Sequence, residues 1–280
     1  MGAALGWGIA DYSAALSSRR IGVFWTMLGM QVVGTLAYAA ALLALGRWPA
    51  LSLAQLPYAV ALAVLGFLAL LVFYRALALG PIAVVSPIAG AYLAVAILLI
   101  VAFLGERLSL AQTGAVGLTF AGVVLASTDL RTLAATVGRP LPGVGLAVLA
   151  MLGFGAWAAL LAQATRVQDG LATVLLLRVA SVVILAALAL GLRSALPARR
   201  DGAVLALVVT VGLFDTLANV LYVLGVQSGH ATIVATGSGV YPVVPALLAI
   251  TVLGERLAPN QYAGVALLVA GLVALGLQTA

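Results

Sequence analysis

Ten long apolar runs follow one another along the chain, and this pattern restricts the fold more than any other feature. A helix needs roughly 20 apolar residues to cross a bilayer. The runs have approximate limits 2–17, 23–46, 54–79, 82–104, 109–128, 143–165, 170–193, 202–228, 231–253 and 258–278. Strands of a membrane β-barrel alternate apolar and polar residues over about ten positions, whereas these runs are continuous. The sequence therefore predicts an all-α integral membrane protein with ten transmembrane helices.

The composition excludes several other classes of protein. Of 280 residues, 65% are apolar and 7% are charged, whereas about 25% of residues are charged in soluble domains. A soluble enzyme, a disordered chain and a nucleic-acid-binding domain are excluded. All thirteen positive residues are arginines, and most lie between apolar runs, which is typical of a topology signal rather than a phosphate-binding patch. We expect no nucleic-acid partner.

The sequence also offers little for catalysis or metal binding. It has no cysteine and a single histidine, His230. Thiolate nucleophiles and cysteine-ligated metals are therefore excluded, and one histidine cannot form a metal site. We expect no cofactor, no metal and no catalytic residue, and hence a protein that is not an enzyme.

An internal repeat organises the ten runs. Residues 105–108, Gly-Glu-Arg-Leu, recur as residues 254–257, an offset of 149. Applied without gaps to residues 80–124, this offset gives 18 identities in 45 positions, where chance would give roughly one in ten. An offset of 147 aligns the earlier helices more weakly, pairing Gly6 with Gly153, Gly8 with Gly155, Arg19 with Arg166 and Gln31 with Arg178.

The repeat predicts how the two halves are oriented. The copies occupy residues 1–128 and 143–280, joined by a loop over 129–142, and each contains five expected spans. Because five is odd, the second copy begins on the opposite side of the membrane, so the repeats are inverted. Inverted repeats are common in secondary transporters, which bind substrate at mid-membrane between the halves.

The sequence resembles a known family. The motifs that carry the resemblance are Gly6-Trp7-Gly8, the segment from Tyr74 to Pro81 running into Ser86-Pro87, and the two Gly-Glu-Arg-Leu turns. These motifs are similar to those of the drug/metabolite transporter superfamily, in particular its EamA-like ten-helix members. The resemblance covers the whole chain and implies two inverted five-helix EamA-like repeats. It also implies carrier-type movement of small organic molecules, often amino acids or drugs leaving the cell, by a multi-pass protein of the cell membrane.

Ionisable residues within the spans are candidates for function, because each costs about 2.5–3.5 kcal/mol to insert at the centre of a membrane helix. The expected spans contain four that stand out, namely Asp11, Arg75, Arg178 and Asp215. Asn219 and Tyr222 share a helix face with Asp215, and this face is suited to an amine, a carboxamide or a proton. Alternatively, the two acids form permanent salt bridges with Arg178 or Arg75. We expect Arg75, near the end of its span, to be structural.

Repeat equivalence and aromatic character extend the candidate site. Arg178 occupies the position of Gln31 in the first copy, so it either binds a substrate carboxylate or pairs with an acid. Tyr92 and Tyr241 are equivalents that either line the cavity or pack. The candidate substrate-binding or coupling residues are Trp7, Asp11, Gln31, Tyr92, Trp157, Arg178, Asp215, Asn219, Tyr222 and Tyr241.

Three further expectations concern structural roles. Trp157, just after two glycines, could act as a movable aromatic gate. Glu106 and Glu255, in the two repeated turns, are expected to cap helices rather than to catalyse. Prolines within the fourth and ninth spans are expected to bend both spans around a central cavity; they are Pro87, Pro242 and Pro245.

These patterns favour a secondary carrier that moves a small-molecule substrate by alternating access. We expect an exporter, surrounded by membrane lipid and present as a monomer or weak homodimer, with protons as a coupling ion through Asp11 or Asp215. The alternative is a flippase of lipids or lipid-linked sugars with the same fold, which a lateral groove between helices would favour.

The arginines outside the spans bear on orientation. With ten spans, both termini lie on one side. That side holds Arg47, Arg107 and Arg166. The other side holds Arg19, Arg20, Arg131, Arg139, Arg193, Arg199, Arg200 and Arg256. Because positive residues are in excess on cytoplasmic loops, the count predicts external termini, whereas many members of the superfamily keep their termini inside.

Overall fold

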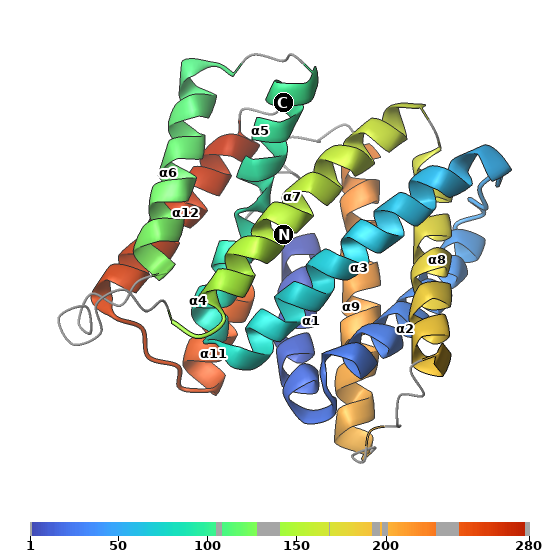
Figure 1. Cartoon of the computed structure of the whole chain (residues 1–280), viewed down its shortest axis with the longest axis horizontal. Helices are drawn as coiled ribbons and strands as arrows, with labels where there is room; N and C mark the ends of the chain where they lie inside the picture. Colours follow the sequence, from blue (N-terminus) through green and yellow to red (C-terminus); the bar gives the residue numbers. More distant parts are fainter. Residues whose placement is uncertain are drawn as a thin grey trace.

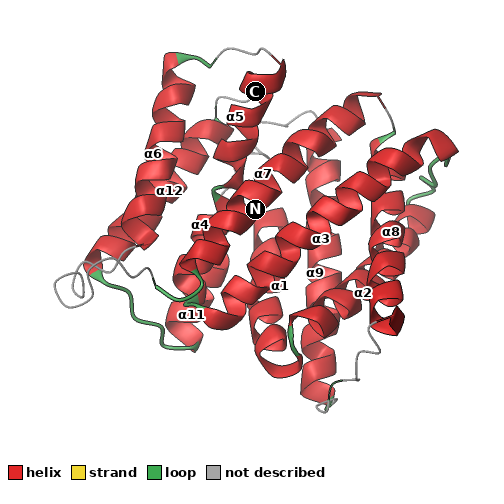
Figure 2. Cartoon of the chain, viewed as in Figure 1, coloured by secondary structure: helices red, strands yellow, loops and turns green. Residues whose placement is uncertain are grey.

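The computed structural model forms a bundle of helices (Figure 1). It describes residues 2–104, 108–127, 141–167, 169–191, 197, 201–227 and 241–277. Within these ranges every regular element is a helix (Figure 2). The helices are α1 (Gly2–Ile21), α2 (Val23–Ala44), η1 (Leu53–Gln55), α3 (Leu56–Leu79), α4 (Ile82–Gly90), α5 (Tyr92–Leu104), α6 (Leu110–Ser127), α7 (Val144–Val167), α8 (Gly170–Gly191), α9 (Gly202–Gln227), α11 (Val243–Val252) and α12 (Pro259–Gly276).

Several helical segments are suited to a bilayer. Seven of the described segments are long and apolar enough to cross one, from α2, α3 with η1, α4 with α5, α7, α8, α9 and α12. Helices α6 and α11 are apolar but shorter. The chain is therefore a multi-pass, all-helical membrane protein. The number ten stays a prediction, because α1 is not among these seven segments and residues 228–240 of the ninth expected span lie outside the described residues.

Helix ends follow the local sequence. A capping box opens α6, since Ser109 N donates to Gln112 Oε1 at 2.8 Å and Gln112 N donates to Ser109 Oγ at 3.1 Å. Helix α12 begins at Pro259 as predicted. One limit is corrected: the first helix continues to Ile21 rather than ending near residue 17. Ser17, Ser18 and both arginines that follow belong to this helix.

The fourth expected span is two helices rather than one. It is interrupted at Ala91, four residues after Pro87, where α4 ends and α5 begins. Proline has no N–H to donate within a helix, and the chain turns where Gly90 lies directly against the ring of Pro242. A side chain on Gly90 would overlap that ring, so this glycine permits α4 to meet the start of α11. The fourth span is thus interrupted after Pro87, while its predicted bend around the cavity stays a prediction.

Helices of one half pack on helices of the other half, and the helices at equivalent repeat positions make equivalent contacts. Helix α1 packs on α9 and α7 packs on α3, while α2 packs on α9 and α8 on α3 (Figure 1). Small residues bring the first two pairs together: a β-carbon on Gly6 would lie 2.8 Å from that of Ala218, and one on Gly153 would lie 3.0 Å from that of Ala69. Ala69 and Ala218 are separated by the repeat offset of 149.

Helices α6 and α12 run antiparallel. Along their contact, Thr119 lies against Gly271, Gly122 against Leu268, and Ala126 against Gly264. Position numbers rise in one helix as they fall in the other, which defines the antiparallel arrangement. Beside this pair lies α4, all nine of whose residues are buried, and the core extends from it to the helices around the cavity.

Candidate functional site

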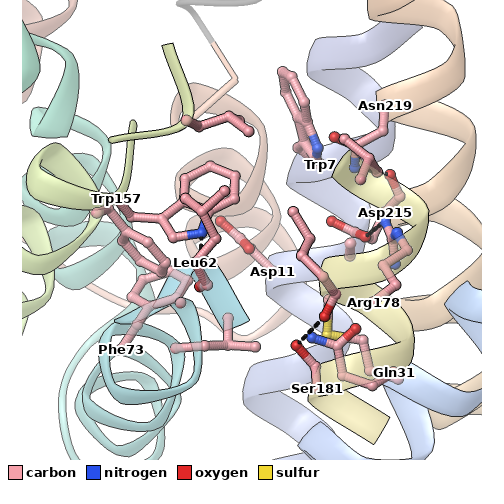
Figure 3. Close-up of a pocket in the computed structure, with 18 of the residues that line it drawn as sticks. Trp7, Asp11, Gln31, Leu62, Phe73, Trp157, Arg178, Ser181, Asp215 and Asn219 are labelled. Carbon is pink, nitrogen blue, oxygen red and sulfur yellow. Dashed lines mark hydrogen bonds and ion pairs between the residues drawn. The ribbon is translucent and has the colours of Figure 1, made fainter. Parts of the chain in front are cut away.

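A cavity of about 250 Å³ lies between the two halves of the chain. Helices α1, α2, α3, α7, α8 and α9 all contribute to its lining (Figure 3). Nine of the ten candidate residues line it, namely Trp7, Asp11, Gln31, Tyr92, Trp157, Arg178, Asp215, Asn219 and Tyr241. Tyr222, the tenth, packs behind Trp7 with ring centroids 5.7 Å apart. The structure therefore brings these residues together, while their roles remain predictions.

An ion pair joins α8 and α9 at the cavity wall. Arg178 Nη2 donates to Asp215 Oδ2 at 2.7 Å, and the two side chains are 6% and 19% exposed. A β-carbon on Gly34 would lie 2.6 Å from Arg178 Nη1, so the glycine leaves room for the guanidinium. The Arg178 guanidinium also lies 5.7 Å from the centre of the Tyr38 ring. Of the alternatives for Asp215, the structure thus places it in a salt bridge with Arg178.

Asp11 has a different environment. Its described hydrogen-bond partner is the Ser86 hydroxyl, which donates to Asp11 Oδ2 at 3.4 Å. The salt bridges described for the structure join neither Arg178 nor Arg75 to Asp11. Arg75 is exposed on α3 and is not among the residues lining the cavity. The alternative in which Asp11 forms a salt bridge with Arg178 or Arg75 is therefore not the arrangement seen, because Arg178 contacts Asp215 and Arg75 is exposed.

Two aromatic clusters flank the cavity. Trp7 lies between Tyr222 and Tyr241, at 5.7 and 5.9 Å between ring centroids. Phe154 lies between Phe73 and Tyr92, at 5.6 and 6.1 Å. Each ring in one cluster corresponds to a ring in the other at the repeat offsets of 147 and 149. Sequence reasoning missed Phe73 and Phe154, although those offsets applied to Tyr222 and Trp7 identify them.

Trp157 is fixed to the neighbouring helix in this structure. Its indole Nε1 donates to the carbonyl of Leu62 at 3.1 Å, and a β-carbon on Gly66 would lie 3.0 Å from the same nitrogen. The ring forms part of the cavity wall with its one polar group already bonded. An aromatic gate at this position would have to break that bond to move.

The lining is polar on one side and apolar on the other. Figure 3 shows Asp11 between Trp157 and Phe73 on one side and the Arg178–Asp215 pair on the other. The polar side comes mainly from α2, α8 and α9, which also supply Gln31, Ser181 and Asn219. The apolar side comes from α3 and α7, with Leu62, Leu70, Phe73, Phe154, Trp157 and Leu161.

Away from the cavity, Arg19 and Glu255 join three parts of the chain at one end of the bundle. Glu255 accepts hydrogen bonds from the backbone of Ile82 and Ala83 at 3.1 and 2.9 Å, which caps the positive N-terminal end of α4. Arg19 donates to the carbonyls of Leu77 and Gly80 and lies 4.0 Å from Glu255.

We call this arrangement the Arg19–Glu255 clasp. The predicted capping role of Glu255 is confirmed. Glu106, His230 and the Arg166 side chain lie outside the described residues.

Comparison with known proteins agrees with this architecture. A family model described as the EamA-like transporter family matches residues 1–128 and 141–277. A solved crystal structure, titled only as that of a protein, is 19% identical with a TM-score of 0.66, covering 100% of this chain and 99% of its own. At that identity the likeness concerns the fold alone. No curated protein matches the chain.

The ion pair predicts a specific pattern of stability. Removing one partner of a buried pair leaves the other charge uncompensated and costs about 3–5 kcal/mol in soluble proteins. We expect Arg178→Gln and Asp215→Asn each to lower the thermal unfolding temperature in detergent, and the double variant to recover at least about 1 kcal/mol of the summed loss. Arg75→Gln is the control and should change little. Additive losses in the double variant would contradict the pairing.

Proposed function

Because this chain belongs to the EamA-like transporter family, and is therefore a membrane transporter of the drug/metabolite type, we propose that it is a secondary active carrier. Its substrate is a small organic metabolite, such as an amino acid or a drug-like amphipathic compound, and it works in the cell membrane. The observation that carries the proposal is the central cavity, to which both halves contribute polar and aromatic side chains. The resemblance to drug/metabolite transporters supports export as the direction.

The proposed architecture is two inverted five-helix repeats, over residues 1–128 and 143–280. The equivalent contacts between the halves support it, since α1 on α9 corresponds to α7 on α3. The antiparallel contact of α6 with α12 supports it further, because these two helices are equivalents in the repeat. Equivalent helices that run in opposite directions are what an inverted duplication produces.

Alternating access requires that each end of the cavity closes in turn, and the Arg19–Glu255 clasp is suited to hold one end. It ties the end of α1, the α3–α4 junction and the turn before α12. The repeat offsets relate Arg19 to Arg166 and Glu255 to Glu106. The sequence therefore carries a second pair of the same residue types, with one member in each half, which the proposed inversion assigns to the opposite end.

Asp11 is the better supported site for a coupling proton. Asp215 is engaged by Arg178 at 2.7 Å, whereas the described partner of Asp11 is the neutral Ser86 hydroxyl. A carboxylate in a membrane bundle without a counter-charge is a natural place for a proton or a cation. The sequence analysis left Asp11 and Asp215 as alternatives, and the ion pair favours Asp11.

A lipid flippase of the same fold is supported less well. A flippase needs a groove that opens sideways to the lipid, whereas the feature that the structure describes is a cavity lined by helices from both halves. Asp11, Arg178 and Asp215 also line this cavity, to which both halves contribute.

Alternating access predicts that the cavity reacts from both faces of the membrane. The chain contains no cysteine, so Ser181→Cys places a single thiol at the cavity. We expect impermeant thiol reagents to label it from either face. Adding Glu255→Gln should raise labelling from the face of the clasp at least about fivefold, because a charged hydrogen bond contributes roughly 1.5–3 kcal/mol.

The matched control for this experiment is Arg256→Gln, which alters the exposed neighbouring residue and should leave the rates unchanged. Labelling from one face alone, in the presence and absence of Glu255→Gln, would contradict alternating access.

The coupling role of Asp11 predicts a separation of two transport modes. A compound that stabilises the protein in a thermal-shift screen would be supplied, at saturating concentration, to proteoliposomes that contain the protein and carry a pH gradient. We expect Asp11→Asn to abolish gradient-driven accumulation while exchange continues, because the variant cannot take up a proton at this position. Full accumulation by a folded Asp11→Asn variant would rule out the role.

A further inference from the structure

Among the described residues that line the cavity, one carboxyl group, that of Asp11, has no charged partner. The described lining contains three charged side chains, Asp11, Arg178 and Asp215. The contact of 2.7 Å between Arg178 and Asp215 neutralises two of them. Asp11 remains, with the Ser86 hydroxyl as its described partner. Other described arginines do not supply the missing charge: Arg19 is engaged in the clasp, and Arg20, Arg47, Arg75 and Arg256 are exposed.

The wall that faces this charge is apolar. Phe73, Phe154 and Trp157 lie there with leucine side chains, and the only hydrogen-bond donor of the Trp157 ring is bonded to Leu62. In Figure 3 Asp11 projects between this wall and the ion pair. A ligand that fills the cavity therefore meets a carboxylate at one point and aromatic faces at another. Aromatic faces also attract cations.

The size of the cavity restricts the ligand further. An apolar cavity of about 150 Å³ holds benzene, and this cavity has a volume of about 250 Å³. It therefore has room for one ring with a short charged chain. A much larger ligand would need the cavity to expand.

From these observations we infer that the carrier selects a small amphipathic organic cation, whose ammonium group binds at Asp11 and whose ring or aliphatic part packs against Phe73, Phe154 and Trp157. This inference rests on the proposed function and narrows its substrate class. A carboxylate on the same ligand is disfavoured, because Arg178 is already occupied by Asp215 and the two acids repel an anion. An amine should therefore bind better than the amino acid with the same ring.

Three ligands that share a phenyl ring test the inference. Phenethylamine carries only the amine, phenylalanine carries the amine and a carboxylate, and 3-phenylpropionate carries only the carboxylate. We expect titration calorimetry on the purified, full-length protein in detergent to show phenethylamine binding at least about tenfold more tightly than phenylalanine, with 3-phenylpropionate weakest. Tighter or equal binding of either carboxylate, or no binding of phenethylamine, would overturn the inference.

Two variants test whether the Asp11 carboxylate is the group that binds the amine. Asp11→Asn should weaken the binding of phenethylamine at least about tenfold. It should also reduce the ratio between the affinities for phenethylamine and phenylalanine. Asp201→Asn is the matched control, because Asp201 is exposed and accepts a hydrogen bond from Val204 N at the start of α9, where asparagine is an equally good cap. Thermal unfolding would verify that both variants fold. An unchanged phenethylamine affinity in folded Asp11→Asn would overturn the assignment.

Failure of the inference and failure of the proposed function give different results. If the cavity is labelled from both faces but the protein prefers phenylalanine, the proposed function is supported and the cation site is ruled out. If the protein binds phenethylamine through Asp11 but is labelled from one face only, the cation site is supported and the carrier mechanism is ruled out.

Discussion

Three charged side chains are found among the described residues that line the central cavity, and their accommodation determines how the centre of the molecule is built. A charge inside a membrane is tolerated where it faces the interior of the bundle and finds a partner or water. Arg178 and Asp215 meet this requirement by direct contact between α8 and α9, and Gly34 on α2 leaves the space that the guanidinium needs. The relative positions of α2, α8 and α9 therefore depend on this one ion pair. Asp11 on α1 is left facing the cavity with a neutral partner.

The two halves share their packing but differ in the polar residues that they place at the cavity. Equivalent close contacts recur, as where Gly8 approaches Val244 and Gly155 approaches Val95. At the cavity, however, Gln31 corresponds to Arg178, Gly66 to Asp215 and Leu70 to Asn219. The residue types at these cavity positions differ between the halves, whereas the close helix contacts recur. The described lining of the cavity thus has one polar wall and one apolar wall.

Much of the fold and of the site could be predicted from the sequence, for identifiable reasons. Helices are local, so long apolar runs and capping residues such as Ser109 indicate where they lie. Buried polar residues are costly in a membrane, so Asp11, Arg178 and Asp215 stood out as candidates, and each lines the cavity.

What could not be predicted depends on contacts between distant segments. The sequence left open whether Arg178 pairs with Asp11 or Asp215, because their distance depends on how α1, α8 and α9 cross. Phe73 and Phe154 resemble ordinary core residues in an apolar run. The Arg19–Glu255 clasp joins residues from opposite ends of the chain, and no local pattern marks such a pair.

The central claim, that equivalent parts of the two halves face opposite sides of the membrane, is tested most directly at Ser52 and Asp201. These exposed residues lie 149 positions apart, and each accepts a backbone hydrogen bond at the start of a helix. Single cysteines at the two positions would be labelled with an impermeant maleimide in right-side-out and inside-out vesicles. Inverted repeats predict that each cysteine reacts in a different vesicle type. Reaction of both in the same type would contradict the account.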